Sequence, residues 1–340
     1  MSFNLKQIIN YFLQKSQIKK EHILKTTKKI SQFKNIILTT LIIFFLASMI
    51  FQPSKFIRQA LNGISAWTFN VLPSVLPFMF FTRVLSGLNT MQKFTRPFSG
   101  ITTKFFKTPP ISFYTFFMAI LSGYPVGSKM VADLYMQGQI TKQDAFKITS
   151  FCSTSGPMFI IGAVGIGMFN SAKIGYILFA SHVLSAIING LIYRNLKTKD
   201  VVKRDLTDSS NTKSFDLSDI VLNSTLSILS VGCIITIFFI IIECFYPILN
   251  LLPQNISYFL EGIIEITKGC LDISTLPNKF LAVSLCSFVI SFGGISTLLQ
   301  SITMLTKVNM PVKLFALQKL THAILSFIIT ILILTIQNLL

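Results

Sequence analysis

Long apolar runs dominate the pattern of hydrophobic and polar positions along this chain. They cover about residues 36–51, 64–88, 111–121, 151–169, 174–193, 221–249, 280–305 and 312–336. A helix that crosses the lipid core of a membrane needs roughly 20 mostly apolar residues, and several of these runs reach that length. The pattern therefore predicts an all-α fold, a polytopic transmembrane helical bundle with about eight membrane segments.

A polar stretch divides the runs into two membrane halves, residues 36–194 and 220–340. The linker between the halves, 195–219, carries nearly balanced basic and acidic residues, and the N-terminal segment, 1–35, holds eight lysines. Because basic residues gather on the cytoplasmic side of membrane proteins, both segments are predicted to be cytoplasmic. Apolar residues recur at roughly helical spacing in the N-terminal segment, which indicates either an amphipathic helix on an anionic leaflet or a solvated tail.

Composition and charge agree with a membrane protein. Only 12% of the residues are charged, against about a quarter in a soluble domain. The net charge of +18 lies mainly in the N-terminal segment and the connections, where it fits anionic membrane lipid better than nucleic acid. The five cysteines lack metal-ligand spacing, and no known catalytic or nucleotide-binding motif is present. We therefore expect no metal, no cofactor, no nucleic-acid partner and no enzymatic activity.

Small residues interrupt two of the apolar runs. One run ends in Ser122-Gly-Tyr-Pro-Val-Gly-Ser128, and another contains Ser291-Phe-Gly-Gly-Ile-Ser296. A full crossing by residues 111–126 would place the basic linker outside the cell, so a re-entrant hairpin that turns near Ser122–Ser128 is predicted. The likeness of the two interruptions predicts an internal two-fold repeat, with ordinary glycine-mediated helix packing as the alternative.

The interruptions are also where a solute-binding site is expected. A broken helix offers backbone N–H groups and the positive end of its dipole, which attract anions. Interrupted segments in both halves of a transporter mark its central site. The candidate binding residues are Ser122, Gly123, Tyr124, Pro125, Gly127, Ser128, Lys129, Ser155, Gly156, Glu265, Thr267, Ser291, Gly293, Gly294, Ser296 and Gln300.

Several candidates have a structural alternative. Lys129, which would supply a positive charge, could pair with Asp133 one helical turn away. Ser155 could be a helix N-cap. Glu261 and Glu265 are spaced to share one helix face, which could meet either a cavity or water. The candidates for ion or proton coupling are Asp133, Glu261 and His322.

A set of motifs resembles a known family. The motifs are Val71-Leu-Pro-Ser-Val-Leu-Pro-Phe78, Ser122-Gly-Tyr-Pro-Val-Gly-Ser-Lys129, Val131-Ala-Asp-Leu134, Phe151-Cys-Ser-Thr-Ser-Gly-Pro-Met-Phe-Ile160, Leu260-Glu-Gly-Ile-Ile-Glu-Ile-Thr-Lys-Gly-Cys270, Ser291-Phe-Gly-Gly-Ile-Ser296 with Gln300, and Lys319-Leu-Thr-His322. Over about residues 36–340 they resemble the sporulation integral membrane protein YlbJ (SpoVV) family, which carries the nucleoside-recognition Gate domain. Two features depart from the family pattern: a longer basic N-terminal extension, and Ser153-Thr154 where amides are expected.

The resemblance implies a role in spore maturation. Members of this family are implicated in moving dipicolinic acid, a small anionic solute, into the forespore across the outer forespore membrane. The Gate domain implies likeness to concentrative nucleoside transporters, which use paired re-entrant hairpins. The alternative is a non-transporting membrane component of spore-envelope assembly, acting through copies of itself or other sporulation membrane proteins.

Overall fold

The computed structural model describes residues 35–87, 93, 96–197 and 217–339. Every regular element in these ranges is helical, which confirms the all-α prediction. The predicted N-terminal segment and most of the linker lie outside the described residues. The chain forms two compact units, one ending at Ile57 and the other beginning at Arg58.

The first unit contains the apolar helix Asn35–Phe51. It ends at Gln52, and Pro53 begins the next helix, α2 (Pro53–Ala66). Proline has no backbone N–H and clashes with the preceding turn, so it is tolerated at the start of a helix and breaks its interior. The predicted stop at Gln52-Pro53 is confirmed.

In the second unit, α2 continues through the π-helical turn η1 (Trp67–Val71) into α3 (Leu72–Gly87). Pro77 lies inside α3 without ending it. The long helix α10 (Leu217–Leu249) packs against α3. Short helical turns follow α3, namely η2 (Arg96–Phe98), α5 (Ser99–Ile101) and η3 (Thr102–Phe106).

The first half then forms three elements in sequence. A hairpin comes first, made of α6 (Ile111–Ser122) and α7 (Val126–Met136). An interrupted helix follows, made of α8 (Lys142–Cys152) and η4 (Met158–Met168). The long helix α9 (Ala172–Tyr193) completes the set.

The second half repeats this order after α10. A hairpin is made of α11 (Gln254–Ile264) and α12 (Ile266–Ser274), and an interrupted helix of α13 (Lys279–Phe292) and α14 (Gly294–Leu305). The short turn η5 (Thr306–Val308) leads into the long helix α15 (Val312–Leu339). The internal repeat predicted from the sequence is therefore present in the order of the elements.

In both hairpins the two helices pack closely, with small residues where their backbones approach. In the first, Ala119 of α6 faces Gly127 of α7, where an added Cβ would lie 2.9 Å from the Ala119 methyl. In the second, Gly262 of α11 and Gly269 of α12 leave no room for a side chain between them. Each pair is centred on a turn, near Gly123 and Glu265 respectively. The predicted turn-back near Ser122–Ser128 is confirmed.

The predicted register of the repeat is wrong by one element. The sequence pairs Ser122–Ser128 with Ser291–Ser296, but the first is a hairpin tip and the second interrupts a helix. By position, the Ser122–Ser128 tip corresponds to the tip at Glu265. The second hairpin turns at Ile264-Glu-Ile266, where Glu265 has extended backbone angles, so no glycine or proline marks the turn.

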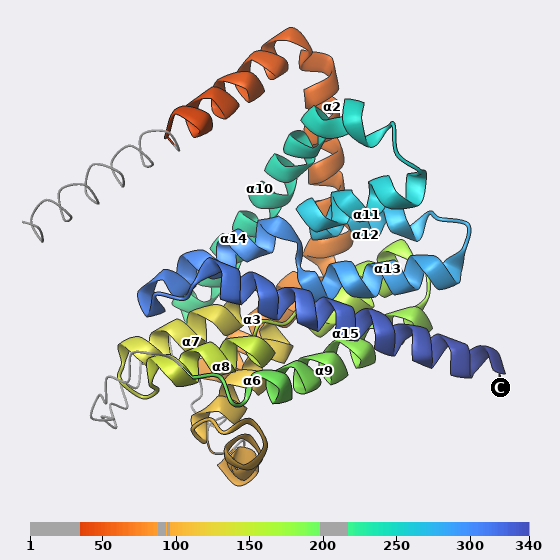
Figure 1. Cartoon of the computed structure of the whole chain (residues 1–340). Coiled ribbons are helices and arrows are strands. Elements are labelled where there is room, and N and C mark those ends of the chain that lie inside the picture. The colour runs from red at the N-terminus through yellow and green to blue at the C-terminus, as the bar shows by residue number, and fades with distance from the viewer. Residues whose placement is uncertain (1–34, 88–92, 94–95, 198–216, 340) are drawn as a thin grey trace, which may run out of the picture. The chain divides into compact units, whose positions relative to one another are not determined.

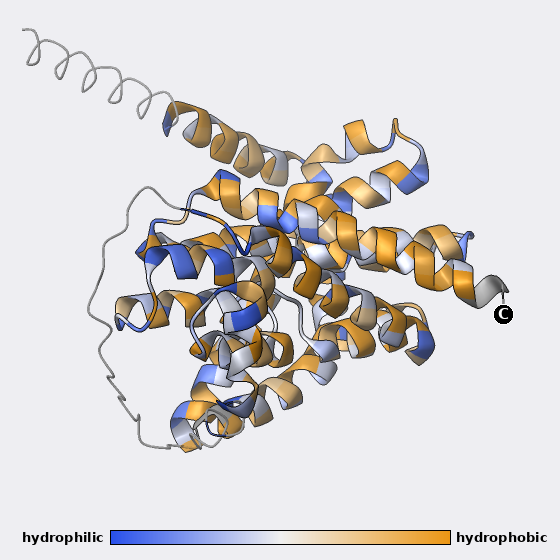
Figure 2. Ribbon diagram, turned by 60° about the horizontal axis from the view of Figure 1, so that its bottom comes forward, coloured by the Kyte–Doolittle hydropathy of each residue, from blue (hydrophilic) through white to orange (hydrophobic). Residues whose placement is uncertain are grey.

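Three of the long helices pack side by side in the second unit. In Figure 1, α15 lies between α13 and α9, and α15 packs against both. Among the described residues, five helices are long and apolar enough to cross a membrane. They are Pro53–Leu85, Ala172–Tyr193, Leu217–Leu249, Lys279–Val308 and Val312–Ile336. Figure 2 shows hydrophobic residues along most of each helix and hydrophilic residues concentrated at turns and helix ends.

Candidate functional site

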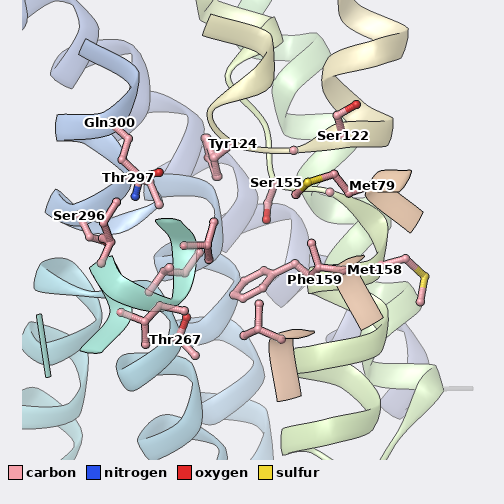
Figure 3. A pocket seen from close by; sticks show the side chains of 18 of the residues that line it. Met79, Ser122, Tyr124, Ser155, Met158, Phe159, Thr267, Ser296, Thr297 and Gln300 are labelled. Atoms are coloured by element: carbon pink, nitrogen blue, oxygen red, sulfur yellow. The ribbon is translucent and has the colours of Figure 1, made fainter. Parts of the chain in front are cut away.

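The four interruptions of the repeat meet around one cavity of about 90 Å³. Polar and small residues line it from both hairpin tips, from the α8–η4 interruption and from α14. In Figure 3, Ser296, Thr297 and Gln300 lie on one side, and Ser155, Met158 and Phe159 on the other. Apolar side chains form the rest of its lining, namely Val71, Val75, Phe78, Met79, Leu121, Val231, Ile234 and Ile235. We call this space the central cavity.

Direct contacts join the four interruptions. A Cβ on Gly123, at the first hairpin tip, would lie 2.5 Å from the backbone nitrogen of Gly156. A Cβ on Gly294, at the start of α14, would lie 3.1 Å from the backbone nitrogen of Ile266 in the second tip. The Tyr124 hydroxyl donates to the Ser291 carbonyl at 3.4 Å. Each hairpin tip is thus held against an interrupted helix.

Three helices present their N-terminal turns to the central cavity. Lining residues include Met158 in the first turn of η4, Thr267 in that of α12 and Ser296 in that of α14. The first turn of a helix has N–H groups without intrahelical partners and carries the positive end of the helix dipole. Neither η4 nor α14 has a side-chain N-cap. The cavity is therefore suited to negative charge.

Ser296 also offers the cavity a free hydroxyl. Its side chain is 2% exposed, and its Oγ has no hydrogen-bond partner among the described residues. Buried polar groups are nearly always hydrogen-bonded, because leaving one unpaired costs about 1–3 kcal/mol. A polar solute in the cavity would satisfy this hydroxyl.

Lys319 of α15 places a buried amino group behind the cavity wall. Its side chain is 2% exposed, and Nζ donates to the Ser153 carbonyl at 2.7 Å and to the Tyr124 hydroxyl. Nζ also lies 4.6 Å from the centre of the Tyr124 ring. Ser153 is the C-cap of α8, where a cation complements the negative end of the helix dipole. Lys319 thus fixes a cavity-lining tyrosine against the α8–η4 interruption.

The sequence-based choice of Lys129 is not supported by its position. Lys129 lies on α7, where its side chain is exposed and does not line the central cavity. Asp133, its predicted alternative partner, forms an exposed ion pair with Lys307 at 3.9 Å. Lys319 was missed as a site residue, although an ionisable side chain within an apolar run is itself a signal of function.

His182 of α9 connects the two interrupted helices. Its Nε2 accepts from the Ser155 backbone N–H at 2.9 Å, so the ring proton lies on Nδ1 and points at Ser291 Oγ, 2.8 Å away. The His322 ring stacks near it, with centres 4.7 Å apart, and His322 Nε2 contacts the His182 carbonyl at 3.1 Å. Both histidines are buried, and neither lines the central cavity.

The acidic residues of the second hairpin separate into two environments. Glu265 lines the cavity and caps α12 by accepting from the Lys268 backbone N–H at 2.7 Å. Glu261 lies in α11 and pairs with the Lys268 ammonium at 2.9 Å, and that ammonium also contacts Asp272. The prediction that Glu261 and Glu265 share one helix face is wrong, because α11 ends at Ile264.

The remaining predicted residues also divide by position. Those that line the central cavity are Ser122, Gly123, Tyr124, Ser155, Gly156, Glu265, Thr267, Ser296 and Gln300. Those that do not are Pro125, Gly127, Ser128, Lys129, Ser291, Gly293 and Gly294. Gly127 packs against the Cys152 carbonyl, and Gly293 packs against Tyr124, so both support the cavity from outside.

Comparison with known proteins finds one curated relative at a significant level. The chain is 25% identical to the sporulation integral membrane protein YlbJ of Bacillus subtilis (strain 168), over 89% of this chain and 84% of that protein. This similarity, over most of the length of both proteins, supports assignment of the chain to the YlbJ family. Similarity to an integral membrane protein and the five long apolar helices together support a multi-pass membrane protein. No family model matches the chain and no solved structure matches it significantly, so the Gate domain stays a prediction.

Proposed function

We propose that this chain carries a small planar carboxylate, dipicolinate, across a membrane during spore maturation. The observation that carries the proposal is the central cavity, which three helix N-termini and the unpaired Ser296 hydroxyl face. Helix N-termini bind carboxylates through backbone N–H groups. The sporulation role follows the name of the relative in Bacillus subtilis.

Glu265 adds a condition to this proposal. Its carboxyl group lines the cavity beside the position that a carboxylate solute would occupy. Two carboxylates in contact repel, and such pairs hold one proton between them. We therefore propose that a proton moves with the solute.

The proposed location is the outer forespore membrane, and the proposed mechanism is alternating access. With the N-terminus in the cytoplasm, the chain would lie in the outer forespore membrane and move its solute without chemical change. Alternating access in transporters built from repeats comes from motion of one bundle against another around a fixed site. The two hairpin tips, each held on an interrupted helix, supply such a site.

Uptake of labelled dipicolinate by proteoliposomes tests the proposal. We expect uptake above that of protein-free liposomes, competed by excess unlabelled dipicolinate and increased by an inward proton gradient. Folded, reconstituted protein that takes up no dipicolinate under either gradient would contradict transport. That result would favour the alternative, a non-transporting component of spore-envelope assembly.

A further inference from the structure

A second hollow lies beside the second hairpin. This polar groove, of about 400 Å³, is lined by amide side chains from α2 and η1 and by charged ones from α12. The amides are Gln59, Asn62 and Asn70, and the charged residues are Lys268 and Asp272. The groove is several times larger than the central cavity of about 90 Å³.

Polar side chains at this density are costly in a bundle of apolar helices unless water reaches them. Lys268 and Asp272 keep 12% and 20% of their side-chain surface exposed, although they bond to one another. In membrane proteins such groups line water-filled pathways. The groove therefore has the character of an aqueous vestibule.

The groove and the central cavity share three walls. On the first wall, Asn70 lines the groove and the next residue, Val71, lines the cavity. On α12, Lys268 lines the groove and Thr267 lines the cavity. The third wall is α10, where residues one turn apart line the two spaces. The two spaces therefore lie on either side of a common layer.

That layer is apolar and closed. Val71, Ile235 and Phe239 belong to one buried cluster, and Leu271 packs against it. Phe239 is 1% exposed and lines the groove, whereas Ile235, one turn earlier on α10, lines the cavity. The Phe239 ring packs against Gly63, where a Cβ would lie 3.2 Å from it. The ring thus lies at the groove side of the buried cluster that contains the cavity-lining Val71 and Ile235.

We propose that the polar groove is the vestibule through which solute reaches the central cavity, and that the Phe239 ring is the gate between them. The identity of the solute rests on the proposed function, but the gate does not. The groove would receive small planar carboxylates: Lys268 can exchange its Asp272 partner for a solute carboxylate, and the amides can bond to the remaining polar atoms.

Cysteine labelling tests the gate without any solute. The reporter is Thr267→Cys, on the cavity side, in a parent in which Cys233 and Cys244 are serine. The other cysteines, Cys152, Cys270 and Cys286, are buried. The rate of reaction with a membrane-impermeant thiol reagent is measured from each side of the membrane, with the parent lacking the reporter as background.

With Phe239 intact, we expect slow labelling of the reporter from the groove side. Phe239→Ala should speed it several-fold, whereas Phe69→Ala should not, because Phe69 lines the groove but its side chain is 77% exposed. Phe239→Leu leaves a larger side chain in place than Phe239→Ala does and should give an intermediate labelling rate. It tests the gate even if Phe239→Ala fails to fold.

An unchanged rate in Phe239→Leu and in folded Phe239→Ala, or an equal gain in Phe69→Ala, would overturn the gate. Because no solute takes part in the labelling, a negative labelling result would reject the gate without bearing on dipicolinate uptake. A negative uptake result would likewise reject dipicolinate transport without bearing on the gate.

Discussion

Lys319→Met should lose dipicolinate uptake while the protein still folds. Methionine matches the length of the lysine side chain but has no charge and no donor. Tyr124, which lines the cavity, loses the bond that fixes it at the cavity wall. A buried hydrogen bond that loses one partner costs about 1–3 kcal/mol, so uptake or binding should fall by roughly fivefold or more.

Stability should change little in the same variant. Among the described residues Lys319 forms no ion pair, so its burial is offset by two hydrogen bonds and by its contact with the Tyr124 ring. Removing a buried polar amino group regains its desolvation cost, which counteracts the loss of the Ser153 and Tyr124 bonds. Thermal unfolding in detergent measures this, and uptake is measured on the same preparation.

Lys129→Met is the matched control. It removes the same charge from an exposed position on α7, outside the cavity lining. We expect uptake and unfolding temperature equal to those of the unaltered protein. Loss of uptake in Lys129→Met with normal uptake in Lys319→Met would show that uptake depends on Lys129 and not on Lys319.

Gly123→Ala should destabilise the protein strongly. Gly123 has φ +72°, a backbone conformation that costs a residue with a side chain about 1–3 kcal/mol. Its new Cβ would lie 2.5 Å from the Gly156 nitrogen, and overpacking of this kind costs about a further 1–3 kcal/mol. Together these are a large part of the roughly 5–15 kcal/mol by which domains are stable.

Gly100→Ala is the control for this substitution. Gly100 lies in a short helical turn, and an added Cβ would meet nothing within 4 Å. We expect a lower unfolding temperature and a lower folded yield for Gly123→Ala alone. Equal unfolding temperatures for the two variants would show that the hairpin tip is not held against the α8–η4 interruption.

Glycine and proline interrupt helices through local effects, and they made most of the site predictable from the sequence. Gly123 and Pro125 mark the first hairpin tip, and Gly293-Gly294 marks the α13–α14 interruption. These residues act locally, through missing side chains or missing N–H groups, so the sequence alone reveals them. The all-helical fold followed from the lengths of the apolar runs.

The remainder depends on contacts between distant segments. The turn at Glu265 has no glycine or proline, and tertiary packing at Gly262, Gly269 and Gly294 defines it. Because the sequence does not reveal that turn, it pairs Ser122–Ser128 with Ser291–Ser296, one element out of register. Lys129 was misplaced because helical periodicity from Val126 puts Gly127, Ser128, Val131 and Ala132 on the buried face.

Equilibrium binding of dipicolinate to the purified protein tests the central cavity most directly, with Ser296→Ala and Ser301→Ala compared. Both hydroxyls lie on α14, and both are buried without a partner among the described residues, but only Ser296 lines the cavity. We predict roughly tenfold weaker binding for Ser296→Ala, because one hydrogen bond to a carboxylate is lost, and unchanged binding for Ser301→Ala. Equal affinities for the two variants, or no binding by the unaltered protein, would contradict the account.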